Sequence, residues 1–589
     1  MEYLKKAFKW FVKTTMTVII VFIVLFVLIA IFISKISYDQ LNEGKVVKRD
    51  SFLVLSFPNG LQESPNDKIN LFSINNLKDL SKKQLTFYEV LQSISQASND
   101  NKIKGILLDL DSWGISGVHT KELSIAMTRF KSTGKKIYAY SNGMNKSNYL
   151  AAIFADEIIM PPSNSSSLLL SGYSISVPYY KDLENKLGIN VNVIHIGDFK
   201  GSGENFARST MSNNYRNSIT NLLDARLELY IDDVSTNRKI DKNTFTSLLL
   251  NGDLAFINPF EAVKLKLIDK TQSYDDFLAE KNITKKQLVN INDYPPKNNY
   301  TFSDSKIAVV FAEGAIAMGN GGSEYMENSI YPEKFSKIFD QIEKDKDIKA
   351  LVLRVNSPGG SALASELILQ KINNLKKKIP VIVSMGPVAA SGGYYISSFA
   401  DKIFLDKYSV TGSIGVVAII PNFKGLIDKI GINYEKIEKG KYANLFNFTD
   451  STSQEEIVLF KKIMTETYVE FKDRVSKGRN ITTDALEEIA QGKIWTGDQA
   501  VANGLADEIG GIERAIEEAA NIGRIKNYSV EMFPKPKTFT EMLFETEIET
   551  SVNIFNGIES KELKSSLKLL DNSIKYAKKP ILLMPYTLE

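Results

Sequence analysis

Ser391 stands where the sequence can present a nucleophilic hydroxyl. It follows a run of small apolar residues expected to form a strand, and it precedes residues 392–396, which are expected to begin a helix. A serine at such a turn exposes its hydroxyl, while the next backbone N–H groups and the helix dipole face developing negative charge. Those residues also fit a plain helix N-cap, which is the commoner role for serine at a helix start.

Two glycine-bearing turns offer backbone amides to the same site. Residues 356–360, with the sequence Asn-Ser-Pro-Gly-Gly, end the strand before the one that leads to Ser391. Paired glycines let backbone amides approach a ligand without obstruction by side chains. The N–H groups of Gly360 and Gly392 are therefore candidates for an oxyanion hole, with a tight turn that binds nothing as the alternative.

Lys200 is the candidate general base, in the glycine-rich segment 197–203 after a strand expected over 191–196. An unperturbed lysine has a pKa near 10.4, so a base at neutral pH requires burial that lowers this pKa by several units. Ser413, within residues 411–415, is a candidate to hold the amine in place. The alternatives are a solvated lysine and an ordinary turn serine.

The composition limits the other possible bases. The chain has two histidines and no cysteine, which excludes a thiol nucleophile and a multi-histidine metal centre. His195 is the rival base, but in an alternating strand it faces away from position 200. His119 lies in a polar segment without an acid–His–Ser sequence context. A Ser-Lys dyad requires neither histidine, cysteine nor metal, so we expect no cofactor.

The chain also contains a long internal repeat. Residues 103–114 match residues 348–359 at a constant separation of 245 positions. The same register places Lys146 opposite Ser391, and a second match places Lys200 opposite Ala443. The first half therefore lacks the serine, and the second half lacks the lysine. This complementary loss predicts a duplicated fold in which a single active site remains and is shared between the two lobes.

Each lobe alternates apolar strands with amphipathic helices. Strands are expected at 51–57 and 306–311, and one repeating unit comprises a strand at 350–355, a helix at 362–377 and a strand at 381–384. Such alternation predicts βαβ units and a largely parallel sheet, hence an α/β fold. The segment 292–299 has the Pro and Asn content of a linker.

A membrane anchor is expected near the N-terminus. Residues 14–33 carry no charge over a length that, as a helix, spans about 30 Å; a buried core helix is the alternative. Lysines before this run favour a cytoplasmic N-terminus and a body on the other side of the membrane. The expected divisions are a cytoplasmic N-terminus, an anchor, a lobe carrying the lysine, a lobe carrying the serine and a helical tail: 1–13, 14–34, 35–300, 301–535 and 536–589.

The bulk composition is that of a folded body attached to this anchor. The chain has 589 residues, 43% of them hydrophobic, and 72 basic against 69 acidic residues give a net charge of +3. No dense basic stripe is present, so nucleic acid is not expected as a partner.

Together these residues resemble the signal peptide peptidase A (protease IV) family in its long, duplicated form. The resemblance covers roughly residues 50 to 530. The motifs that carry it are 354–361 (Arg-Val-Asn-Ser-Pro-Gly-Gly-Ser), 384–386 (Ser-Met-Gly), 389–394 (Ala-Ala-Ser-Gly-Gly-Tyr), 411–415 (Thr-Gly-Ser-Ile-Gly), 495–497 (Trp-Thr-Gly) and 504–507 (Gly-Leu-Ala-Asp).

The resemblance implies a Clp-protease/crotonase-like fold in each lobe. It further implies a homo-tetrameric ring at a bacterial inner membrane, with an extracytoplasmic body that cleaves signal-peptide remnants and other apolar extended peptides. Carried over by motif, Ser391 is the nucleophile, Lys200 the base, Gly360 and Gly392 the oxyanion donors, and Ser413 the residue that orients the lysine. Residues 200–206 depart from the usual loop of the family, and Lys186 and Lys181 are the nearest alternative lysines.

Two other functions remain open at this stage. An acyl-CoA enzyme of the crotonase type shares the oxyanion geometry but needs no Ser-Lys pair. A catalytically silent membrane scaffold requires that Ser391 and Lys200 never meet.

Overall fold

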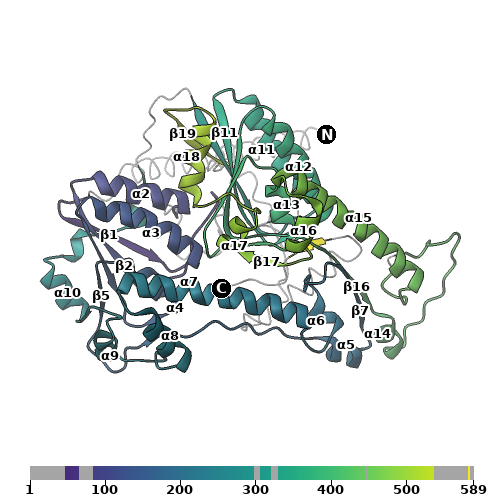
Figure 1. Cartoon of the computed structure of the whole chain (residues 1–589), viewed down its shortest axis with the longest axis horizontal. Coiled ribbons are helices and arrows are strands. Elements are labelled where there is room, and N and C mark those ends of the chain that lie inside the picture. Colours follow the sequence, from purple (N-terminus) through teal and green to yellow (C-terminus); the bar gives the residue numbers. More distant parts are fainter. Residues whose placement is uncertain are drawn as a thin grey trace, which may run out of the picture.

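The computed structural model of the chain describes residues 47–65, 84–296, 305–319, 329–445, 447–535 and 581–583. They form an α/β fold built around two largely parallel sheets (Figure 1). The expected N-terminal segment and anchor lie outside the described residues, as does the expected tail apart from residues 581–583. Within the described part, no helix is both long enough and apolar enough to cross a membrane.

The two sheets have the same strand order, as the internal repeat predicts. The first sheet runs β8-β5-β3-β2-β1-β9, and all its strand pairs are parallel. The second runs β18-β14-β13-β11-β10-β19, also parallel throughout this path. The strands of the first sheet are β1 (Ser51–Phe57), β2 (Ile103–Trp113), β3 (Lys136–Tyr140), β5 (Glu157–Met160), β8 (Lys270–Thr271) and β9 (Leu288–Asn290). Those of the second are β10 (Lys306–Glu313), β11 (Ile348–Ser357), β13 (Val381–Ala390), β14 (Lys402–Leu405), β18 (Glu508–Ile509) and β19 (Ser529–Phe533).

The helices repeat as well. The helices of the first lobe are α2 (Phe87–Asn99), α3 (Gly117–Ser132), α4 (Lys146–Ala152), α5 (Lys181–Leu187), α6 (Glu204–Ala207), α7 (Asn213–Arg238), α8 (Lys242–Asn251), α9 (Pro259–Lys264) and α10 (Tyr274–Glu280). Those of the second are α11 (Pro332–Lys344), α12 (Ala362–Lys376), α13 (Gly392–Ser397), α14 (Lys424–Lys429), α15 (Gln454–Arg479), α16 (Thr483–Ile489), α17 (Gly497–Ala502) and α18 (Ile512–Ile522). Helices α7 and α15 are counterparts: each has 26 residues, a serine N-cap and a left-handed C-cap residue.

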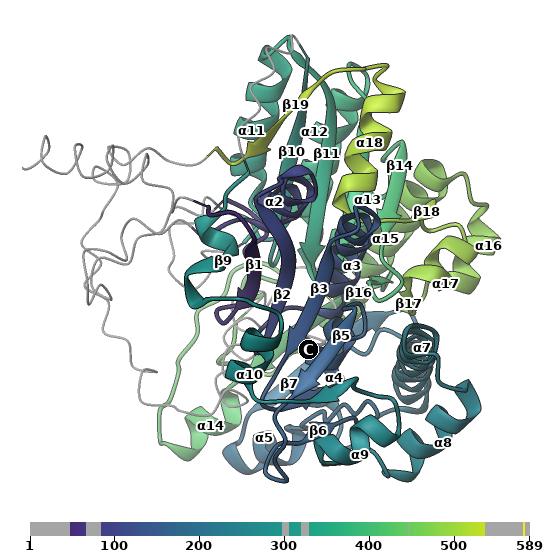
Figure 2. The ribbon, with the colours of Figure 1, turned by 90° about the vertical axis from the view of Figure 1, so that its left-hand side faces the viewer.

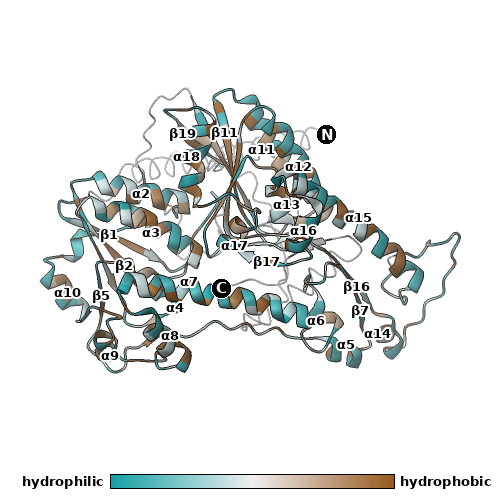
Figure 3. Cartoon of the chain, in the orientation of Figure 1, coloured by the Kyte–Doolittle hydropathy of each residue, from teal (hydrophilic) through white to brown (hydrophobic). Residues whose placement is uncertain are grey.

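One hydrophobic core joins the lobes. Helices α2 and α3 lie between the two sheets (Figure 2), where residues such as Leu55 and Phe87 pack in the same buried cluster as Val309, Val352 and Ile516 of the second lobe. Strand β11 is hydrophobic along most of its length, whereas the exposed helix α15 alternates between apolar and polar residues (Figure 3). The lobes therefore fold as one body.

A segment of the first lobe leaves its own sheet and crosses to the second lobe. Figure 1 shows α5, β7 (Asn190–Ile196) and α6 beside β16 (Val416–Asn422), with α7 leading back toward the first sheet. Strand β7 pairs antiparallel with β16 over its full length, from Asn190 opposite Asn422 to Ile196 opposite Val416. This pairing brings the residues after β7 to the second lobe.

Strand β13 extends six residues beyond the end predicted at Ser384. Its last residues are small and buried, and they find a second partner in β15 (Val410–Gly412), which pairs antiparallel with β17 (Ile494–Thr496). The extension carries the strand directly to Ser391. In the described part of the tail, residues Ile581–Leu583 form strand β20 rather than the predicted helix.

A cluster of buried charged side chains links the two lobes next to the second sheet. Arg354 of β11 contacts Glu63 at 2.9 Å and Glu122 of α3 at 2.7 Å, and all three side chains are almost fully buried. Burial alone raises the pKa of Glu63, but the charge of Arg354 and the contact with His119 lower this pKa to about 2. Because both carboxyl groups belong to the first lobe, the guanidinium of Arg354 adds a buried ionic link between the lobes.

Replacing Arg354 by Met should destabilise the protein by about 3–5 kcal/mol, because two buried carboxyl groups lose the same cation. The measurement is the shift in the denaturation midpoint of the detergent-solubilised full chain. Lys424→Ala is the control: it removes an exposed ion pair with Asp428, and such a change costs about 1 kcal/mol or less. Equal midpoints for the two variants would contradict a fastening role for the cluster.

Candidate active site

The turn that carries Ser391 is strained and buried. Ser391 lies between the end of β13 and the first residue of α13, with φ 55° and ψ −115°. Its backbone N–H donates to the carbonyl of Gly412 at 2.8 Å. The side chain makes no N-capping hydrogen bond, so the plain N-cap alternative does not describe it. A positive φ on a non-glycine residue costs free energy and is typical of functional turns.

Lys200 reaches Ser391 from the other lobe. Its Nζ lies 2.8 Å from Oγ of Ser391, 2.8 Å from the carbonyl oxygen of Ser413 and 2.9 Å from Oγ of Ser413. Ser391, Lys200 and Ser413 are exposed by only 0%, 3% and 1%. The structure therefore brings together the three side chains that the sequence singles out from segments up to 213 residues apart.

Backbone contacts with the second lobe fix the position of Lys200. The N–H of Phe199 donates to the carbonyl of Gln491 at 2.9 Å. A Cβ on Gly492 would lie 2.5 Å from the backbone nitrogen of Lys200, so only a glycine allows the two chains to approach this closely. The lysine is thus held at its backbone as well as at its amine.

The surroundings of Lys200 favour the neutral amine. Burial lowers its pKa well below the ordinary value, and desolvation is the cause. A neutral amine has two N–H groups and one lone pair, which matches its three neighbours: Ser413 offers two oxygens as acceptors, and the Ser391 hydroxyl can donate to the lone pair. This arrangement has the geometry that a general base at Lys200 requires.

The two glycines proposed for the oxyanion hole lie beside each other. A Cβ on Gly392 would lie 3.1 Å from the backbone nitrogen of Gly360 and 2.8 Å from Oγ of Ser365. A Cβ on Gly360 would lie 2.0 Å from the carbonyl oxygen of Ile316. Neither position accepts a side chain. The short distance from Gly392 also shows that the backbone nitrogen of Gly360 lies next to the first residue of the helix that follows Ser391.

The other candidate bases lie elsewhere. His195 is exposed and sits within β7 opposite Val417. Lys186 is exposed, and Lys181 donates to Asn190. Lys146, opposite Ser391 in the repeat, begins α4, where its amine lies over the ring of Tyr173.

His119 has an environment that its sequence neighbours did not indicate. Its Nδ1 lies 2.9 Å from Oγ of Ser116, and its Nε2 lies 2.5 Å from Oε1 of Glu63. The expectation that His119 lacks an acid–His–Ser context is therefore wrong in three dimensions. Because Glu63 is also bound to Arg354, we assign this arrangement to the cluster between the lobes.

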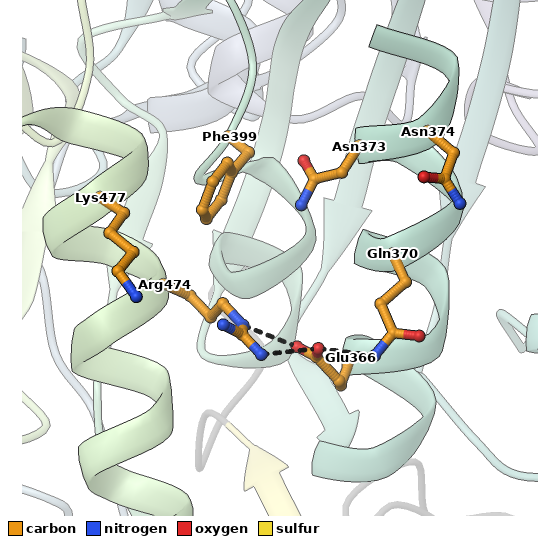
Figure 4. Close-up of a pocket in the computed structure, with 7 residues that line it drawn as sticks. All are labelled: Glu366, Gln370, Asn373, Asn374, Phe399, Arg474 and Lys477. Atoms are coloured by element: carbon orange, nitrogen blue, oxygen red, sulfur yellow. Dashed lines mark hydrogen bonds and ion pairs between the residues drawn. The ribbon is translucent and has the colours of Figure 1, made fainter. Parts of the chain in front are cut away.

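A further polar network supports the helix after Ser391. The hydroxyl of Tyr395 donates to Glu366 at 2.7 Å, and Arg474 of α15 binds the same carboxylate through two nitrogens. Figure 4 shows this ion pair at the edge of a polar cavity of about 510 Å³ between α12 and α15. The residues lining the cavity do not include Ser391 or Lys200. No sequence signal linked Glu366 and Arg474, which lie 108 positions apart.

Comparisons with known proteins show the family to which the chain belongs. The profile described as "Peptidase family S49" matches residues 129–288 and 373–526, more than half of the chain. Protease 4 of Haemophilus influenzae is 32% identical over 481 residues, which cover 77% of this chain and 76% of that protein. The chloroplastic serine protease SPPA of Arabidopsis thaliana is 30% identical over 478 residues, which cover 78% and 70%.

One solved structure aligns with part of the chain. A mutant of ClpP1 from Listeria monocytogenes aligns with 35% of this chain and 94% of its own, at 15% identity and a TM-score of 0.24.

The depressed pKa of Lys200 predicts a pH dependence for acylation of Ser391. The neutral fraction of the amine falls about tenfold for each pH unit below its pKa, so the labelling rate with a fluorophosphonate should fall with the same slope as the pH is lowered. Above that pKa the rate should be constant. His195→Ala should leave the profile unchanged, because this histidine is exposed within β7. A profile that moves with His195, or a rate independent of pH, would contradict Lys200 as the base.

Proposed function

The chain belongs to peptidase family S49 and is a serine protease, and we propose that it is a membrane-anchored endopeptidase that degrades cleaved signal peptides in or at the membrane. Ser391 is the nucleophile and Lys200 the general base. The observation that carries this assignment is the 2.8 Å separation of Nζ and Oγ at a buried lysine whose pKa is lowered.

Acylation begins with the neutral amine of Lys200. It takes the proton of the Ser391 hydroxyl as Oγ attacks the carbonyl carbon of a peptide bond. The negative charge that develops on the carbonyl oxygen is stabilised by the N–H groups of Gly360 and Gly392. The ammonium of Lys200 then gives its proton to the leaving amine, which leaves an acyl-enzyme on Ser391 and a neutral lysine.

Deacylation follows the same route in reverse. Lys200 takes a proton from water as the water oxygen attacks the ester carbonyl, and the same amides stabilise the second oxyanion. Collapse of this intermediate returns the proton to Oγ of Ser391 and releases the carboxylate product. Throughout the cycle the backbone carbonyl and hydroxyl of Ser413 keep the amine pointed at Oγ.

The proposed substrates are apolar peptides in an extended conformation. Signal-peptide remnants are apolar, and the short strand β12 (Gly359–Ser361) lies beside the Ser391 turn, with an edge that pairs with β20 in this structure. An extended peptide that pairs with such an edge gains main-chain hydrogen bonds independently of most of its side chains. This mode suits a protease that degrades many related sequences.

We also propose the setting of the enzyme. Residues 14–34 anchor it in the bacterial inner membrane with residues 1–13 in the cytoplasm, and the two lobes, each of Clp-protease/crotonase-like fold, lie on the extracytoplasmic side as a homo-tetramer. The uncharged run 14–33 supports the anchor, and the common strand order supports two lobes of one fold.

The two alternative functions gain no support at the site. A silent scaffold requires Ser391 and Lys200 to be apart, whereas their functional atoms are at hydrogen-bond distance. A crotonase-type acyl-CoA enzyme has no use for a desolvated lysine directed at a serine.

The dyad is tested by activity-based labelling and hydrolysis of an apolar reporter peptide by the detergent-solubilised full chain. Ser391→Ala and Lys200→Ala should each lower the hydrolysis rate by about 10³-fold or more, because the two residues act as a unit. Ser391→Ala should also abolish labelling.

Lys146→Ala is the matched control, because Lys146 is the residue of the first lobe that corresponds to Ser391 in the repeat. This substitution should leave the hydrolysis rate within about twofold of that of the unmodified chain. Persistent labelling of Ser391→Ala would show that the nucleophile is another residue. A folded unmodified chain that neither labels nor hydrolyses would favour the scaffold.

A further inference from the structure

Helices α12 and α13 each begin beside one of the two glycines proposed to bind the oxyanion. Gly360 lies in β12, and Ser361, the last residue of that strand, is the N-cap of α12. Gly392 is the first residue of α13. The relative position of the two glycine N–H groups therefore depends on how α12 and α13 are held against each other.

A single carboxylate links these two helices. Glu366 of α12 accepts a hydrogen bond of 2.7 Å from the hydroxyl of Tyr395 on α13. The backbone N–H of Tyr395 donates to the carbonyl of Ser391 at 2.8 Å. Tyr395 is thus bound at its backbone to the proposed nucleophile and at its hydroxyl to α12.

The carboxylate is itself held from a third helix. Nε and Nη2 of Arg474 on α15 lie 3.1 and 2.9 Å from its two oxygens, and Nε2 of Gln370 donates to Oε1 at 2.8 Å (Figure 4). Burial alone raises the pKa of Glu366, but hydrogen bonds from Arg474, Tyr395 and Gln370 lower it below the ordinary value. Glu366 is therefore ionised at neutral pH, and an ionised acceptor forms stronger hydrogen bonds than a neutral one.

The two helices pack closely where they begin. A Cβ on Gly392 would lie 2.8 Å from Oγ of Ser365, the residue before Glu366. This hydroxyl donates to the carbonyl of Ser361 at 2.9 Å. Ser365 and Tyr395 are both buried. Because these contacts are direct, a rotation of α13 against α12 would change the distance between the amides of the two glycines.

We propose that Glu366 and Tyr395 are positioning residues for the reaction at Ser391. Their hydrogen bond fixes α13 against α12 and thereby sets the separation between the amides of the two oxyanion glycines. Such donors act on charge that develops only in the transition state, so the link affects kcat rather than substrate binding. The inference rests on the proposed function, because it requires Ser391 to be the nucleophile.

Tyr395→Phe tests the link in the detergent-solubilised full chain, because it removes only the hydroxyl that binds Glu366. With the apolar reporter peptide, kcat should fall by about fivefold or more, while KM changes by less than about twofold. The affinity for a peptide aldehyde, whose adduct with serine carries an oxyanion, should fall by the same factor as kcat/KM. The midpoint of the pH profile for acylation should stay unchanged, because Lys200 is not part of the link.

Tyr394→Phe is the matched control. Tyr394 is the preceding residue of α13 and is also fully buried, but its hydroxyl donates to the carbonyl of Leu505 at 2.8 Å and not to α12. The control loses a comparable buried hydrogen bond and should show a similar shift in denaturation midpoint, with kcat within about twofold of the unmodified chain. Equal losses of kcat in the two variants, or a loss confined to KM in Tyr395→Phe, would overturn the proposal.

Failure of the proposed function gives a different result. Hydrolysis that persists in Ser391→Ala would show that Ser391 is not the nucleophile, whatever the positioning variants do. An inactive Ser391→Ala together with full kcat in Tyr395→Phe would overturn the positioning role alone.

The cavity beside the ion pair allows a second test by chemical rescue. Glu366→Ala removes the carboxylate from a cavity of about 510 Å³ that Arg474 also lines (Figure 4), and kcat should fall by about tenfold or more. Propionate, which replaces the lost carboxylate, should raise kcat of this variant by at least about threefold, because it can pair with Arg474 and accept from Tyr395. Propionamide has a similar size and no charge, and should raise kcat less. A folded Glu366→Ala variant that gains nothing from propionate would contradict the role of the carboxylate.

Discussion

The antiparallel pairing of β7 with β16 is the interaction on which the active site depends. The lysine and the serine belong to different lobes, and neither lobe holds both. By pairing with β16 over its full length, β7 carries Lys200 out of its own lobe, and the close contacts at Gln491 and Gly492 then fix its backbone. A shift of this pairing by one residue would turn the side chains of β7 to the opposite face and displace the amine from Ser391.

Forming this site lowers the stability of the folded state, and contacts around the site offset that loss. Ser391 has a strained backbone, and Lys200 gives up the hydration of its charged form. The shared core, the bidentate Arg474–Glu366 pair behind α13 and the Arg354 cluster between the lobes hold these groups in place. The proposed chemistry requires both of these features, because a hydrated lysine would be protonated and a relaxed turn would point the hydroxyl elsewhere.

Duplication explains why one site suffices for two lobes. The sheets share a strand order, and α7 and α15 are matching helices. In the first lobe the turn equivalent to that of Ser391 starts a helix with Lys146, whose amine lies over an aromatic ring. In the proposed mechanism, each lobe supplies the residue that the other lacks. The four-stranded sheet in which β7 pairs with β16 also includes β12 and β20.

The sequence by itself determined the strands at 51–57, 191–196, 306–311 and 350–355, the helix at 362–377, the internal repeat and the candidates Ser391, Lys200, Ser413, Gly360 and Gly392, because local periodicity and repeated motifs are encoded by neighbouring residues. The tertiary structure alone decided that the amine meets the hydroxyl, that Ser391 adopts a positive φ, and that His119 joins Glu63 and Arg354. It also decided that Ile581–Leu583 forms a strand. These features depend on contacts between segments up to several hundred positions apart, such as Glu63 and Arg354. Whether such segments meet depends on the burial and backbone pairing of the whole chain, which no local pattern records.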